Sequence, residues 1–71
     1  MELRFSALLE RGEKYFVASC PEFPEANGQG STREEALRDL GASIQTILEF
    51  RRNEALAQAP PGAERTSVVV S

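Results

Sequence analysis

The absence of histidine limits the chemistry open to this 71-residue sequence. Neither a Ser–His nor a Cys–His nucleophile pair can be built within the chain, and acid–base catalysis by an imidazole is excluded. The single cysteine, Cys20, would need a nearby cation to become a reactive thiolate. The one lysine, Lys14, lies six residues earlier on the same expected strand. We therefore expect Cys20 to be a structural residue at the end of that strand.

The carboxylates do not suggest a metal centre. Two-metal nucleases need acids that converge from rigid elements. Here Glu22 and Glu25 are only close in sequence. Glu34 and Glu35 start an expected helix, and Asp39 is the only aspartate. We predict no catalytic residue, no bound metal and no cofactor, and we expect that the protein is not an enzyme.

Two short motifs resemble parts of nucleotide or nucleic-acid sites but are incomplete. Gly28-Gln29-Gly30 precedes an expected helix, yet it lacks the third glycine and the lysine of a phosphate-binding loop. Arg51-Arg52 is too small a cluster for a nucleic-acid groove, and the net charge of −3 also disfavours binding to a phosphate backbone. We expect the glycines to serve turn geometry and the arginines to neutralise a helix C-terminus.

A β-hairpin is predicted near the start of the sequence. Residues 3–9 alternate apolar and polar side chains, which is the period of a half-buried strand. Residues 10–13 form a polar turn that contains a glycine, and residues 14–20 resume the strand pattern. Because the two strands are joined so closely, we expect them to pair antiparallel.

The segment after the hairpin is harder to interpret. Pro21 and Pro24 are expected to end the second strand, since neither can donate to a ladder. Phe23 between them is expected to anchor the loop in the core. Residues 25–30 fit either a short third strand or a loop that turns at Asn27-Gly28.

A long amphipathic helix is predicted from about residue 33 to about residue 56. Its apolar stripe consists of Leu37, Leu40, Ile44, Ile47 and Leu48. Gly41 inside this run costs about 1 kcal/mol relative to Ala, so we expect close approach of the helix backbone to the sheet or to a second helix.

The start of this helix offers two capping boxes. In one, the hydroxyl of Ser31 accepts from the backbone and Glu34 reaches back. In the other, Thr32 and Glu35 play the same roles one residue later. Both place acids in the first turn, where they interact favourably with the helix dipole.

A final strand is predicted at residues 66–70, which include three consecutive valines. An unbroken β-branched run is typical of a strand covered on both faces, and a strand that follows a helix can return to the sheet parallel to a partner. The helix would then cover one face of the sheet and leave the other exposed unless a second subunit covers it.

The length predicts a single domain with a thin core. One cysteine allows no internal disulfide, so we expect self-association, as a dimer or tetramer, to supply the missing stability. The sequence has neither a membrane-span pattern nor an export-signal pattern, and a lone cysteine fits a reducing compartment. We therefore expect a cytoplasmic protein.

The motif pattern resembles the HicB family of small antitoxin-like domains. The residues that carry the resemblance are Tyr15, Ala18-Ser19-Cys20-Pro21-Glu22-Phe23-Pro24 and Gln29-Gly30-Ser31-Thr32-Arg33-Glu34-Glu35-Ala36. It covers roughly residues 5–60, with Glu25 standing where the family usually has glycine and Asn27-Gly28 replacing its usual β-formers. The resemblance implies an α+β fold in the order β-β-β-α-β, a small mainly antiparallel sheet with one long helix on one face, similar to a truncated ribonuclease H core. The third strand is then expected to be short, bulged or at a sheet edge.

The resemblance also implies a function. Family members bind and mask a small HicA-type mRNA endoribonuclease in type II toxin–antitoxin systems. We expect residues 1–71 to form one HicB-like domain without a C-terminal DNA-binding domain, so that this chain alone does not bind DNA. The alternative is an orphan homo-oligomeric structural or ligand-sensing domain without a toxin. We predict that the partner, a small basic ribonuclease, contacts Glu22, Phe23, Glu25, Glu34 and Glu35.

Overall fold

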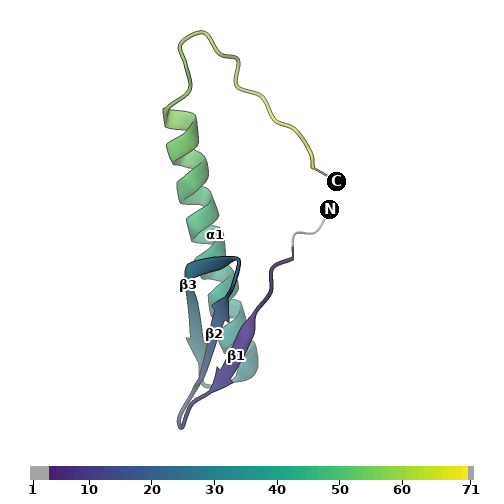
Figure 1. The fold of residues 1–71 in the computed structure, drawn as a ribbon, viewed down its shortest axis with the longest axis vertical. Coiled ribbons are helices and arrows are strands. Elements are labelled where there is room, and N and C mark those ends of the chain that lie inside the picture. Colours follow the sequence, from purple (N-terminus) through teal and green to yellow (C-terminus); the bar gives the residue numbers. More distant parts are fainter. Residues whose placement is uncertain (1–3, 71) are drawn as a thin grey trace.

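The computed structural model describes residues 4–70. Three strands, β1 (Leu8–Arg11), β2 (Phe16–Cys20) and β3 (Phe23–Gly30), precede one helix, α1 (Arg33–Ala57). The strands form one antiparallel sheet in the order β1-β2-β3. The sheet lies beside the first half of α1, and the second half of the helix projects beyond it (Figure 1). The predicted α+β class is therefore confirmed.

The predicted hairpin is present, but its first strand begins later than expected. β1 pairs with β2 from Leu8↔Ser19 to Arg11↔Phe16, and residues 4–7 lie outside the strand. Residue 3, the first of the expected strand, lies outside the described residues. Here the backbone N–H of Ser6 donates to the carboxylate of Glu22 instead of to a neighbouring strand.

The third strand forms, and it is longer than expected. β3 spans eight residues, includes Pro24, and contains Asn27-Gly28 without a turn. It occupies an edge of the sheet, where proline is tolerated, and its pairing with β2 shifts register between Ser19 and Cys20. The expected irregularity and edge position are confirmed, whereas the expected shortness is wrong.

The start of α1 uses the second of the two capping boxes. The hydroxyl of Thr32 accepts from the backbone N–H of Glu35 at 3.1 Å. The carboxylate of Glu35 reaches back one residue further than expected, to the N–H and hydroxyl of Ser31. At the other end, the last turn contains no basic residue, so the expected role for Arg51-Arg52 is wrong.

The core lies between α1 and the sheet. Its buried side chains are Ala18, Cys20, Phe23, Ala26, Ala36, Leu40 and Ile44. The predicted anchoring of Phe23 and the structural position of Cys20 are confirmed.

Close contact between helix and sheet occurs at a glycine other than the expected one. A Cβ at Gly28 would lie 2.4 Å from the carbonyl oxygen of Ala36, whereas a Cβ at Gly41 would meet nothing within 4 Å. The expected close approach at Gly41 is therefore wrong for the single chain, and Gly28 takes that role.

The predicted fourth strand is wrong. Residues 66–70 form no strand, and Val68, Val69 and Val70 are 86%, 85% and 70% exposed. After α1 the chain turns at Gly62, which has a positive φ of 86°, and runs back at a distance from the helix (Figure 1). α1 projects beyond the sheet before the chain turns back, and the valine run joins none of the strands (Figure 1).

Candidate functional site

α1 covers one face of the sheet, and within residues 4–70 the opposite face has no such cover. Along β2, Ala18 and Cys20 are buried beneath the helix, whereas the intervening positions point the other way. Strand register extends this alternation to β1 and β3. The uncovered side, which we call the outer face, carries Leu8, Glu10, Val17, Ser19, Asn27 and Gln29.

The chemistry of the outer face favours a protein ligand over a nucleic acid. Leu8 is 56% exposed and Val17 is 39% exposed, and they flank the carboxylate of Glu10. None of the six outer-face residues is a lysine or an arginine. A phosphate backbone needs cations at such a surface, whereas apolar side chains beside a carboxylate suit a basic protein.

One edge of the sheet is closed by side chains from the helix. The backbone N–H of Gln29 donates to Asp39 Oδ2 at 3.0 Å, and the N–H of Asn27 donates to Ser43 Oγ at 3.3 Å. Four residues of a helix rise about 6.0 Å and two residues of a strand about 6.6 Å. Side chains four apart on α1 therefore match backbone N–H groups two apart on β3. Asp39 and Ser43 therefore occupy the donors that β3 would offer to an added strand.

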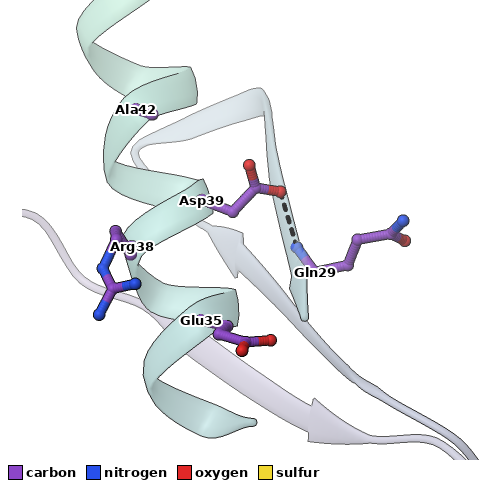
Figure 2. A pocket seen from close by; sticks show the side chains of 5 residues that line it. All are labelled: Gln29, Glu35, Arg38, Asp39 and Ala42. Atoms are coloured by element: carbon purple, nitrogen blue, oxygen red, sulfur yellow. Dashed lines mark hydrogen bonds between the residues drawn. The ribbon is translucent and has the colours of Figure 1, made fainter. Parts of the chain in front are cut away.

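A shallow depression of about 510 Å³ lies along this closed edge. Its lining residues are Gln29, Glu35, Arg38, Asp39 and Ala42. Figure 2 shows the Gln29 side chain pointing away from α1, while Asp39 turns toward the strand backbone. The carboxylates of Asp39 and Glu35 in this depression already accept hydrogen bonds from the backbone of residues 29 and 31. We therefore assign the depression to the closing of the sheet edge and not to ligand binding.

The predicted contact residue Glu22 holds the N-terminal segment. Its carboxylate accepts from the backbone N–H of Ser6 at 3.0 and 3.1 Å and from the Ser6 hydroxyl at 2.9 Å. Cys20 Sγ lies 3.5 Å from Glu22 Oε1. Hydrogen bonds, above all that from the Ser6 backbone, lower the pKa of Glu22 below its ordinary value of 4.5.

Phe23 and Glu25 lie next to this contact. The Phe23 ring meets Phe5 edge-on with centroids 5.1 Å apart, and the guanidinium carbon of Arg51 lies 5.0 Å from the Phe23 centroid. Arg51 Nη2 also pairs with Glu25 Oε2 at 2.8 Å. Arg51 thus ties the C-terminal half of α1 to the start of β3.

The two remaining predicted residues lie elsewhere. Glu34 and Glu35 belong to the first turn of α1, which follows the end of β3. At about 3.3 Å per residue, the ends of β3 at Phe23 and Gly30 are roughly 23 Å apart. The five predicted residues therefore form two groups at opposite ends of the strand.

Within residues 4–70, Glu34 is the one predicted acid whose carboxylate accepts no hydrogen bond and forms no ion pair. Glu35 is committed to Ser31, whose hydroxyl makes the largest contribution to lowering the pKa of the Glu35 carboxyl. Most of the predicted carboxylates thus have partners inside the fold, although they remain exposed.

The pair Asp39 and Ser43 was not predicted from the sequence. The signal was present: each directly precedes a buried residue of the apolar stripe, Leu40 or Ile44, and they are four residues apart. Polar residues with that spacing border a helix face that packs on a sheet.

Between residues 4 and 70, no three Cys, Asp or Glu side chains are grouped so that they could hold a metal ion. In the same part of the chain, α1 lacks the apolar character that crossing a membrane requires.

The sequence is similar to the UPF0150 protein ssl0738 of Synechocystis sp. (strain ATCC 27184 / PCC 6803 / Kazusa). The two are 35% identical over 71 residues, which cover 99% of each chain. No protein-family model matches the sequence, and no solved structure matches it.

Proposed function

Because the chain belongs to the UPF0150 family, we propose a function that fits both its HicB-like motifs and its exposed sheet. The protein is an antitoxin-like binding module that masks a small, basic HicA-type mRNA endoribonuclease of a type II toxin–antitoxin system. It acts by covering the partner, and it catalyses no reaction of its own.

The observation that carries the proposal is the outer face. It presents Leu8 and Val17 to solvent beside the carboxylate of Glu10, with no cation among its residues. A ribonuclease that binds RNA must itself present cations. The net charge of −3 would steer the two proteins together.

Co-expression with the product of the adjacent gene tests the proposal. We expect a small basic protein to co-purify with the chain, and we expect the chain to relieve the growth arrest that this protein causes. Failure of both would contradict the proposed function and favour the alternative, a homo-oligomeric structural or ligand-sensing module without a toxin.

A charge-reversed outer face locates the contact. The double variant Glu10→Lys, Val17→Lys should weaken binding at least about tenfold, because it places two cations opposite a basic partner. Glu54→Lys, on the exposed second half of α1, is the matched control and should bind nearly as the unmodified chain does. Equal binding by both variants would remove the outer face from the proposal.

A further inference from the structure

An apolar pocket lies between the N-terminal segment and α1. It has a volume of about 370 Å³ and is lined by Phe5, Gly41, Ile44, Gln45 and Leu48. Nothing in residues 4–70 comes within 4 Å of a Cβ built at Gly41. A glycine inside a helix costs stability, and a close neighbour that needs the space of a side chain is the usual compensation. No neighbour within residues 4–70 needs that space at Gly41.

The same chain carries an apolar segment that residues 4–70 leave largely exposed. Val68, Val69 and Val70 are between 70% and 86% exposed, and residues 66–70 contain no charged side chain. A cavity of about 150 Å³ can hold a benzene molecule, so a pocket of about 370 Å³ has room for two valine side chains. Pocket and segment therefore match in size and in polarity.

The overall shape indicates that the two come from different copies. The radius of gyration is 15.9 Å and the extents are 55 × 24 × 17 Å, whereas a compact chain of this length would have a radius of gyration of about 11 Å. The excess comes from the projecting half of α1 and from the segment that follows it (Figure 1). An arm that leaves the body of its own chain is suited to lie on the body of another.

We propose that two copies of this chain associate by exchanging arms, with Val68, Val69 and Val70 of one copy seated in the Gly41 pocket of the other. Gly41 allows the close approach of the inserted segment, and Phe5, Ile44 and Leu48 supply its apolar surroundings. The exchange is reciprocal, so each copy both gives and receives an arm. This assembly does not depend on the proposed toxin partner.

Molar mass in solution tests the proposal. Light scattering at micromolar concentration should give the unmodified chain a molar mass of twice 7.8 kDa. Val69→Asp replaces the inserted apolar side chain by a charged one, and Gly41→Leu fills the pocket. Each variant should raise the dimer dissociation constant at least tenfold. Ala63→Asp, in the same exposed arm but outside the valine run, is the matched control and should remain dimeric. Circular dichroism should show that all three variants keep their helix.

Mixing experiments distinguish an arm that binds the pocket of the other copy from an arm that binds the pocket of its own chain. A mixture of the Val69→Asp and Gly41→Leu chains retains one intact seat per mixed dimer and should recover dimer that neither forms alone. In a Cys20→Ala background, a chain with Gln45→Cys should form a disulfide with a separate chain carrying Val69→Cys. A monomeric unmodified chain, or a disulfide that forms only when both cysteines are on one chain, would overturn the proposal.

Discussion

Glu22 shows how a single carboxylate can fix a segment that no strand holds. It receives three hydrogen bonds from Ser6 and so attaches the N-terminal segment to the turn between β2 and β3. The same hydrogen bonds favour the ionised form and lower the pKa of the Glu22 carboxyl. The contact is therefore sensitive to acid.

The pH dependence of stability tests this contact. Because the folded-state pKa of Glu22 lies below its ordinary value of 4.5, its stabilisation is complete above that value and is lost as the pH falls through the lowered pKa. Glu22→Gln should lower the free energy of unfolding at pH 6, and this loss should shrink toward pH 3 as the carboxylate becomes protonated, as measured by urea denaturation. Glu34→Gln removes a carboxylate without a partner in residues 4–70 and should have little effect at either pH.

Two glycines should respond in opposite ways to the same substitution. Gly28→Ala places a Cβ 2.4 Å from the backbone of Ala36 and of Leu40, and forcing the helix away should destabilise the fold by about 1–3 kcal/mol. Gly41→Ala meets nothing within 4 Å and should stabilise the monomer by up to about 1 kcal/mol. Thermal unfolding at low protein concentration measures both, and equal effects would contradict the helix–sheet packing described.

Among the secondary-structure elements, the contact between α1 and β3 has two functions. It buries the apolar stripe, and through Asp39 and Ser43 it occupies the backbone donors of an edge strand. An open edge is a template for pairing with another chain. The closed edge of β3 thus directs association elsewhere on the molecule.

Removing the side chains that accept hydrogen bonds from β3 should allow this strand to pair with another chain. The double variant Asp39→Ala, Ser43→Ala should aggregate faster than the unmodified chain on mild heating, because the N–H groups of residues 27 and 29 become free to pair. Thioflavin fluorescence and light scattering follow the aggregation. Thr46→Ala, which loses only a hydrogen bond to the helical carbonyl of Ala42, is the control and should aggregate at the unmodified rate.

Local patterns predicted the elements that depend on local rules. The apolar stripe predicted α1, and the alternation at residues 14–20 predicted β2, because periodicity reflects which face is buried. Pro24 and Asn27-Gly28 were misleading signals: pairing with β2 and cover from the helix outweigh their turn preference, so β3 continues through them.

The wrong predictions concern features that depend on which distant segments lie next to each other in the fold. The valine run has strand propensity, but α1 carries it away from the sheet before it can pair (Figure 1). The contacts of Glu22 and Glu25 could not be predicted either, since Ser6 and Arg51 are 16 and 26 residues away along the chain. Short-range spacing contains no information about such partners.

At the scale of the whole molecule, stability is distributed unevenly along the 55 Å axis. Every buried side chain of α1 among the described residues lies between Ala36 and Ile44. Beyond Leu48 the described part of the helix contributes no buried side chain, and Arg51, through Glu25 and Phe23, ties it to the sheet. Local opening should therefore be easier at that end.

Hydrogen exchange tests this gradient. In the Val69→Asp chain, in which the proposed exchange of arms is removed, amides of residues 36–47 should exchange at least about tenfold more slowly than those of residues 50–57. Mass spectrometry of peptic fragments gives the comparison. Uniform protection along α1 would contradict it.

The matched spacing of Asp39 and Ser43 on α1 with residues 29 and 27 on β3 also determines where the chain can accept insertions or deletions. Deleting one residue between Leu40 and Ser43 would rotate the following helix by about 100° and carry Ser43 away from the strand, so the sheet would lose its closed border. A residue added after Arg52 would move only segments that touch nothing on the sheet. Insertions and deletions should therefore be tolerated in the outer half of the molecule and rejected in the inner half.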